Sequence, residues 1–213
     1  MIIIGSVFLL ILLLCFEKKG NHKSLIITKS LLSLLFVLTA FLQPNRVPPY
    51  YLYLLVGLIF CLAGDVCLAL PPEKMFRMGL VAFFVGHLFY ILGFSSLTPF
   101  FQWISPAAFL VFLASAVIFF WLRPHLKSML VPVLLYILVI TMMLCGAWAV
   151  FWKSSFPLAG RTLIFAGALC FYLSDLCVAR HKFIKDEFQN RLVGLPFYYL
   201  GQFSLAFSAG FLY

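Results

Sequence analysis

Long apolar stretches follow one another along the chain, separated by short breaks rich in charge or proline. Within a stretch the apolar positions are continuous and do not alternate with polar ones. A continuous run of about 20 apolar residues is typical of a helix that crosses a bilayer, whereas a membrane β-strand gives short alternating segments. The pattern therefore predicts an all-α protein, a polytopic transmembrane helix bundle.

The breaks divide the chain into eight predicted helices. Several breaks contain proline, which cannot continue a helix because it lacks the backbone N–H. The connections are short, so we expect one integral membrane domain over residues 1–213. The predicted spans are about 2–16, 25–42, 51–70, 77–97, 103–122, 129–151, 158–179 and 191–213.

Composition excludes other classes of protein. The chain is 65% hydrophobic and 10% charged, with a mean hydropathy of +1.13, whereas a soluble domain is about 45–50% apolar and about 25% charged. Neither a soluble globular protein nor a disordered chain has these values. The net charge of +9 would suggest nucleic acid as the partner of a soluble protein. Here we expect the lipid bilayer as the partner and no nucleic acid, with the charge residing in basic loops.

The basic residues predict an orientation, because cytoplasmic loops of membrane proteins are rich in Lys and Arg. Of the loop residues, 11 fall in odd-numbered loops and only Arg46, Lys153 and Arg161 in even-numbered ones. We therefore expect the odd loops in the cytoplasm and both termini outside, in a multi-pass membrane protein. The pattern fits a bacterial inner membrane, the location we expect, at least as well as an endomembrane. The 11 residues are Lys18, Lys19, Lys23, Lys74, Arg77, Arg123, Lys127, Arg180, Lys182, Lys185 and Arg191.

A faint internal repeat suggests two parallel four-helix halves. Residues 64–69 (GDVCLA) resemble residues 174–179 (SDLCVA) at an offset of 110, and 89–93 (FYILG) resemble 197–201 (FYYLG) at a slightly different one. Four helices separate the two members, so a true repeat would relate the halves by an axis along the membrane normal. Such matches also arise by chance in apolar sequence, and both interpretations remain open.

Two aspartates are the main candidates for chemistry. Asp65 and Asp175 lie inside predicted helices, while the other acidic residues lie in loops. A charge inside a membrane costs about 2.5–3.5 kcal/mol even on lenient scales, so such residues are functional candidates. Both stand at the same depth, near the cytoplasmic side, where two facing carboxyl groups can act as one acid and one base. The alternative is that each aspartate pairs separately with a basic or hydroxyl group and only locks helix packing.

Further polar side chains within the spans are candidate supporting residues. Lys29, in the second helix, could neutralise a carboxylate, bind a substrate phosphate or extend to the cytoplasmic interface. His87 lies near mid-membrane with Tyr90 on the same face, and is either a packing residue or a proton shuttle. The remaining three candidates are Tyr136, Tyr172 and Gln202. They either support the site or only form hydrogen bonds between helices.

Taken together, these residues resemble the YhhN-like lysoplasmalogenase family of eight-helix membrane hydrolases. The matching stretches occur in order along nearly the whole chain, with one departure, because Ser30 stands where the family usually has proline. They are Thr28–Ser30, Gly64–Leu68, Phe83–Tyr90, Tyr136 with Met142, Gly167–Ala168, Ser174–Asp175, and Tyr198–Tyr199 with Gln202.

The resemblance implies hydrolysis of the vinyl ether bond of a lysoplasmalogen, a lysophospholipid, to a fatty aldehyde and glycerophosphoethanolamine or glycerophosphocholine. Asp65 and Asp175 would be the catalytic acid and base, with Ser174 and the side chains named above in support. The sequence contains no zinc signature, P-loop, nucleophile elbow or Rossmann fingerprint, so we expect no metal and no cofactor.

Two other classes of protein also place carboxylates in a membrane. A proton-coupled small-solute transporter would need a polar pathway through both halves, and the outer half of this chain is almost wholly apolar. An aspartyl intramembrane protease carries a Gly-x-Gly-Asp motif, whereas Asp65 follows Ala63 and Gly64. The transporter remains the alternative to the hydrolase.

Overall fold

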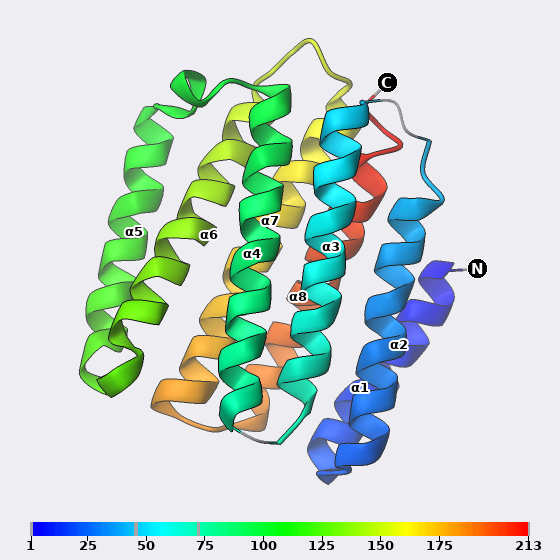
Figure 1. Cartoon of the computed structure of the whole chain (residues 1–213), viewed down its shortest axis with the longest axis vertical. Coiled ribbons are helices and arrows are strands. Elements are labelled where there is room, and N and C mark those ends of the chain that lie inside the picture. Colours follow the sequence, from blue (N-terminus) through cyan, green and yellow to red (C-terminus); the bar gives the residue numbers. More distant parts are fainter. Residues whose placement is uncertain (1, 45–46, 72, 213) are drawn as a thin grey trace.

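The structure is a computed structural model that describes residues 2–44, 47–71 and 73–212. These residues form eight α-helices and no strand, as the all-α prediction requires. Neighbouring helices run antiparallel in an up-and-down bundle (Figure 1). The helices are α1 (Ile2–Lys19), α2 (His22–Phe41), α3 (Pro48–Ala69), α4 (Glu73–Leu97), α5 (Pro106–Leu122), α6 (Leu130–Phe151), α7 (Leu158–Ala179) and α8 (Phe188–Ser208).

Local sequence explains several helix starts. Asn21 and Ser105 precede α2 and α5, and their side chains accept hydrogen bonds from the backbone N–H groups of Ser24 and Ala108. Pro48 begins α3, where a missing N–H costs nothing because the first turn of a helix has no intrahelical acceptor for it. The ends differ from the predicted ones by a few residues, most at α8, which ends at Ser208.

The chain is a multi-pass membrane protein. Six helical segments in the described part of the chain are long and apolar enough to cross a bilayer, and they contain α2 to α7. The bundle also exposes large apolar side chains, including Ile4, Phe109 and Val117, each more than 60% exposed. Such a surface is stable against lipid tails rather than water. That α1 and α8 also cross the membrane stays a prediction.

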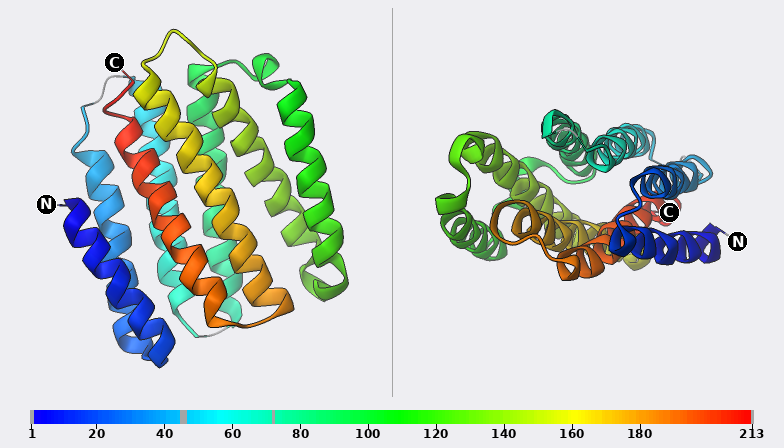
Figure 2. Two further views of the ribbon diagram at one scale, coloured as in Figure 1. Left: turned by 180° about the vertical axis from the view of Figure 1, so that it is seen from behind. Right: turned by 90° about the horizontal axis from the view of Figure 1, so that it is seen from below.

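The connections that follow the odd-numbered helices all lie at one end of the bundle (Figures 1 and 2). They include the five-residue π-helix η4 (Arg180–Ile184) between α7 and α8. The basic residues counted above therefore gather at one end, which we call the basic end.

The repeat has a structural counterpart in two helix hairpins, α3–α4 and α7–α8. Each hairpin crosses at a pair of glycines, where a Cβ atom would meet the partner's backbone. A Cβ on Gly86 would lie 3.0 Å from the Gly57 carbonyl oxygen, and one on Gly201 would lie 2.9 Å from that of Gly167. Gly57 and Gly167 are separated by the predicted offset of 110, whereas Gly86 and Gly201 are 115 apart.

The offset of 115 between Gly86 and Gly201 changes which residues of α4 and α8 correspond. The sequence match pairs Tyr90 with Tyr198, while the glycine contacts pair Phe83 with Tyr198 and His87 with Gln202. The two registers differ by seven residues, or two turns, so both keep the same helix face toward the core. The neighbouring packing agrees with a repeat, because α2 packs on α8 as α6 packs on α4.

Candidate active site

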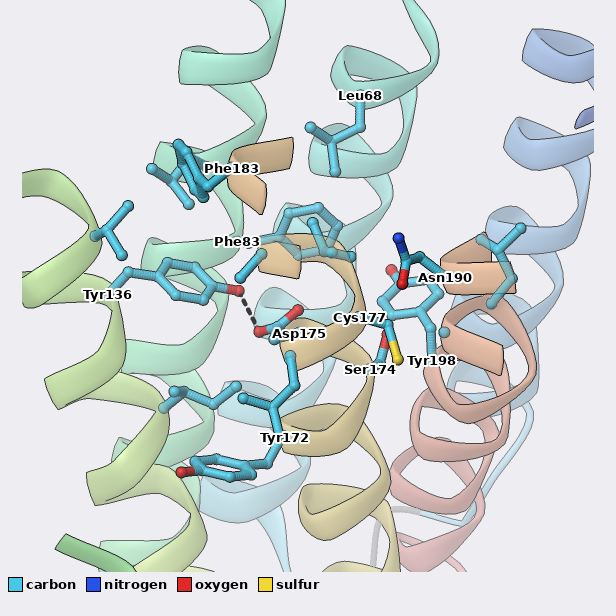
Figure 3. Close-up of a pocket in the computed structure, with 18 of the residues that line it drawn as sticks. Leu68, Phe83, Tyr136, Tyr172, Ser174, Asp175, Cys177, Phe183, Asn190 and Tyr198 are labelled. Atoms are coloured by element: carbon cyan, nitrogen blue, oxygen red, sulfur yellow. Dashed lines mark hydrogen bonds between the residues drawn. The ribbon is translucent and has the colours of Figure 1, made fainter. Parts of the chain in front are cut away.

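A pocket between the two halves of the bundle contains both aspartates. It encloses about 1070 Å³, including open space at its mouth, and helices α2 to α8 contribute to its wall. Most of the lining side chains are apolar or aromatic. Figure 3 shows Asp175, Ser174 and Tyr198 near one another, with Tyr136 of α6 directed toward Asp175 and Tyr172 of α7 on the same side of the pocket as Tyr136.

Asp65 lies in α3, four residues before its end, and is 1% exposed. One of its oxygens, Oδ1, lies 3.1 Å from the ammonium nitrogen of Lys29. The other, Oδ2, accepts hydrogen bonds from Ser33 at 2.6 Å and from Tyr198 at 2.5 Å. Asp65 is therefore surrounded by one cation and two hydroxyl donors.

Lys29 does not reach the membrane interface. Lys29 is 5% exposed, and its side chain extends from α2 to Asp65. Of the roles that the sequence left open, neutralising a carboxylate is the one that this geometry matches. Ser33 follows one helical turn after Lys29, so the two donors reach Asp65 from the same face of α2.

Asp175 lies in α7, again four residues before the helix end, and its environment is different. Its Oδ2 accepts a hydrogen bond from the hydroxyl of Tyr136 at 2.7 Å (Figure 3). No lysine, arginine or histidine nitrogen of the described residues lies within ion-pair distance of it. The two aspartates thus lie equally far from the ends of their helices, but among the described residues only Asp65 has a cation within ion-pair distance.

The two aspartates are not hydrogen-bonded to each other in the described part of the chain. They line the same pocket, so a molecule inside it could touch both. The prediction that the carboxyl groups lie within one water of each other stays a prediction.

Gln202 and Tyr90 belong to a buried chain of hydrogen bonds that leads away from Asp65. Gln202 donates from Nε2 to the Tyr198 hydroxyl at 3.2 Å, and its Oε1 accepts from Tyr90 at 2.8 Å. Tyr90 also lies 3.5 Å from the sulfur of Cys61. The chain fixes the Tyr198 hydroxyl, so Gln202 and Tyr90 act on Asp65 only through Tyr198.

His87 is fully buried and lies beside the aromatic wall of the site. Its Nδ1–H donates to the Phe83 carbonyl oxygen at 2.6 Å. The Nε2 atom has no hydrogen-bond partner among the described residues. The ring packs edge-on against Phe171, with centroids 4.5 Å apart, and against Tyr136 at 5.4 Å. These contacts support a packing role for His87.

The two remaining sequence candidates also line the pocket. The Tyr172 hydroxyl pairs with Ser115 at 2.8 Å, and Thr141 donates to the same Ser115 oxygen at 2.7 Å, which ties α7 to α5 and α6. Ser174 is buried next to Asp175. Tyr172 therefore positions the pocket wall, and the hydrogen bonds of the described residues give Ser174 no contact with either carboxylate.

Sequence reasoning did not select Ser33 or Tyr198 as site residues. A signal was present for both, because Lys29 and Ser33, and likewise Tyr198 and Gln202, are spaced by four residues and share a helix face. That α2 and α8 meet at Asp65 is a property of the tertiary fold, which the spacing within one helix does not contain.

Comparison with known proteins identifies the chain's relatives. The lysoplasmalogenase TMEM86B of Mus musculus is 36% identical over 160 residues, which cover 74% of this chain and 63% of that protein. The proteins of the same name from Rattus norvegicus and Homo sapiens are 34% and 33% identical, over 75% of this chain and 62% and 64% of their own lengths. The chain thus spans less than two thirds of the length of these relatives. No solved structure matches it. The model of the YhhN family matches residues 24–209, nearly the whole chain, and the protein belongs to that family.

Proposed function

We propose that this protein is a lysoplasmalogenase, which hydrolyses the vinyl ether bond of a lysoplasmalogen to a fatty aldehyde and glycerophosphoethanolamine or glycerophosphocholine. The observation that carries the proposal is the pair of membrane-buried aspartates in one pocket with unequal surroundings. Family membership and the printed names of the relatives support the same reaction.

The unequal surroundings suggest a role for each aspartate. Asp65 faces Lys29 and two hydroxyl donors, so it is the carboxylate of the resting site. Asp175 has no cation within ion-pair distance in the described part of the chain, and an unpaired buried carboxylate is costly. We therefore assign the resting proton to Asp175, which makes it the general acid.

These roles give a balanced reaction. Asp175 transfers its proton to the outer carbon of the vinyl ether, and the adjacent carbon and oxygen become an oxocarbenium ion. Asp65 takes a proton from the water that adds to this cation and forms a hemiacetal. Asp175 then takes the hemiacetal hydroxyl proton while Asp65 protonates the departing glycerol oxygen. Both aspartates return to their first states, and the sum is vinyl ether plus water to aldehyde plus alcohol.

The neighbours of each carboxyl group support its task. Tyr136 donates to Asp175, so its hydroxyl stabilises the negative charge that appears when Asp175 gives up its proton. Lys29 keeps Asp65 ionised but also weakens it as a base, which suits an oxocarbenium ion, because such a cation needs little help to capture water. The apolar side chains of α4, α5 and α6 in the wall would hold the hydrocarbon chain.

We also propose the cytoplasm as the compartment at the basic end, with the bacterial inner membrane as the location. The support is the gathering of 11 loop Lys and Arg residues at that end. The lysophospholipid would then enter with its headgroup toward the cytoplasmic surface.

The decisive test uses the full chain, purified in detergent, with a lysoplasmalogen and with the analogue whose ether chain is saturated. We expect aldehyde from the vinyl ether only, because only its carbon can be protonated to an oxocarbenium ion. Asp175→Asn, which keeps the side-chain volume, serves as the inactive control. No aldehyde from the intact wild-type protein, or equal cleavage of the two ethers, would refute the proposal.

A further inference from the structure

Arg191 lies at the mouth of the pocket, in the first turn of α8. It stands seven residues before Tyr198, so the two share a helix face and are about 10 Å apart along the axis. Tyr198 contacts the catalytic Asp65. Arg191 thus lies on the same wall as the reacting centre, displaced from it toward the basic end.

The guanidinium of Arg191 is poorly satisfied within the protein. Its Nε atom is buried and makes no hydrogen bond to any described residue. The nearest carboxylate oxygen, from Glu17 of α1, lies at 3.7 Å, which is an ion pair without a hydrogen bond. The side chain is 25% exposed and lines the pocket, so an anion bound there can contact it.

Two other polar groups near Arg191 on the wall already have partners. Lys29 is held by Asp65, as described above. Asn190, the neighbour of Arg191, accepts from Arg180 through Oδ1 at 2.5 Å and donates from Nδ2 to the Lys185 carbonyl at 2.8 Å. Of the two described cationic residues of the pocket wall, Lys29 is paired at 3.1 Å with a carboxylate inside the pocket, whereas the guanidinium of Arg191 makes no hydrogen bond to a described residue.

From this geometry we infer that Arg191 is the phosphate-binding residue of the site and selects lysophospholipids over uncharged lipids with the same vinyl ether. The inference rests on the proposed function. Guanidinium donors match phosphate oxygens in pairs, and charge-assisted hydrogen bonds of this kind are strong where water is partly excluded. One phosphodiester charge at the mouth would replace the distant Glu17 as the partner of Arg191. The glycerol backbone then connects Arg191 to the vinyl ether at the aspartates.

The test compares two substrates in the detergent-purified protein. One is a lysoplasmalogen, and the other is the corresponding alkenylglycerol, which has the same vinyl ether but no phosphate. We expect Arg191→Gln to lower kcat/KM for the lysoplasmalogen by about ten- to a hundred-fold, mainly through KM, and to leave the alkenylglycerol almost unchanged. Arg191→Lys should recover part of the loss, because it restores the charge but not the fork of donors.

Two control variants separate this role from a general effect of charge or fold. Arg77→Gln removes a positive charge at the same end of the bundle, from an exposed side chain outside the pocket wall. Arg77→Gln should leave kcat/KM unchanged for both substrates. Glu17→Gln removes the internal partner of Arg191 and should lower KM for the lysoplasmalogen, or lower the inhibition constant of glycerophosphoethanolamine.

The possible failures are distinguishable. If the wild type cleaves neither vinyl ether, the proposed function itself is wrong. Equal losses for the two substrates in Arg191→Gln, or a wild type with no preference for the phosphorylated substrate, overturn the inference while the proposed function stands. If Arg191→Gln does not fold, the Glu17→Gln variant decides, since unchanged affinity for lysoplasmalogen and glycerophosphoethanolamine also overturns it.

Discussion

Replacing Lys29 by methionine tests the assignment of charge within the site. The substitution removes the ammonium that lies 3.1 Å from Asp65 and keeps a side chain of similar length and shape. The two side chains are 6% and 2% exposed, so water cannot replace the lost partner. Asp65 must then remain as a carboxylate without a cation, at a large cost in stability, or take up a proton, and the protonated form no longer serves as the resting base.

The magnitude follows from burial. Breaking a buried ion pair by removing one partner costs about 3–5 kcal/mol, and protonation of Asp65 would limit the loss to the lower part of that range. For a chain of this length each kcal/mol shifts Tm by about 2–4 °C, so we expect a Tm on the order of 6–12 °C lower in the same detergent. We expect kcat to fall at least a hundred-fold, because about 3 kcal/mol of lost stabilisation of the carboxylate corresponds to that factor.

The double variant Lys29→Met with Asp65→Asn makes the test sharp. It removes both charges, so Tm should recover most of the loss while activity stays absent. The assay is aldehyde release at several lysoplasmalogen concentrations, together with thermal unfolding followed by tryptophan fluorescence. A Lys29→Met protein with wild-type Tm, unchanged kcat and a raised KM would refute the reasoning, because Lys29 would then be a phosphate ligand.

Three further outcomes are expected. Tyr136→Phe should lower kcat by about ten- to a hundred-fold with little change in KM, because the hydroxyl stabilises the charge that forms on Asp175; steady-state kinetics decide, and a raised KM alone would contradict this role. Gly201→Ala should destabilise the protein by about 1–3 kcal/mol in thermal unfolding, because its Cβ would lie 2.9 Å from the Gly167 carbonyl oxygen, which cannot move aside; an unchanged Tm would contradict the observed crossing. A reporter enzyme fused after the last residue should be active outside the cytoplasm, since α8 runs away from the basic end; cytoplasmic activity would invert the topology.

The helices could be predicted from the sequence because a bilayer imposes a simple rule. Each span must be about 20 residues long and apolar on its lipid side, and its backbone N–H and C=O groups must be hydrogen-bonded within the span. Proline and charge then mark where a span ends, and the eight predicted helices all occur in the described chain. The exact ends were less predictable, as at α8, because short connecting turns can extend a helix or shorten it without any change in the apolar pattern.

The aspartates were identifiable because charge inside a span is rare and costly. Two partners, Lys29 and Tyr136, were also identifiable as polar residues inside spans, but Ser33 and Tyr198 were not. Ser33 and Tyr198 reach Asp65 from α2 and α8, and no spacing within one helix says which helices meet. The alignment of α4 with its counterpart α8 was also not predictable from either helix alone, because a shift of seven residues keeps the same face apolar. Glycine contacts, which depend on both helices together, fix that alignment.

The repeat and the chemistry are connected through the departures from symmetry. Asp65 and Asp175 correspond at the offset of 110, and each receives a donor from the helix that precedes its hairpin, α2 or α6. The α2 donors are a lysine and a serine, whereas the α6 donor is the neutral Tyr136. The second difference is between Tyr198, which donates to Asp65, and its counterpart Phe83, which has no hydroxyl to donate. Both differences stabilise a negative charge on Asp65, and Asp175 lacks the corresponding stabilisation. A symmetric arrangement would give two equal carboxyl groups, whereas acid and base catalysis of one reaction needs two unequal ones.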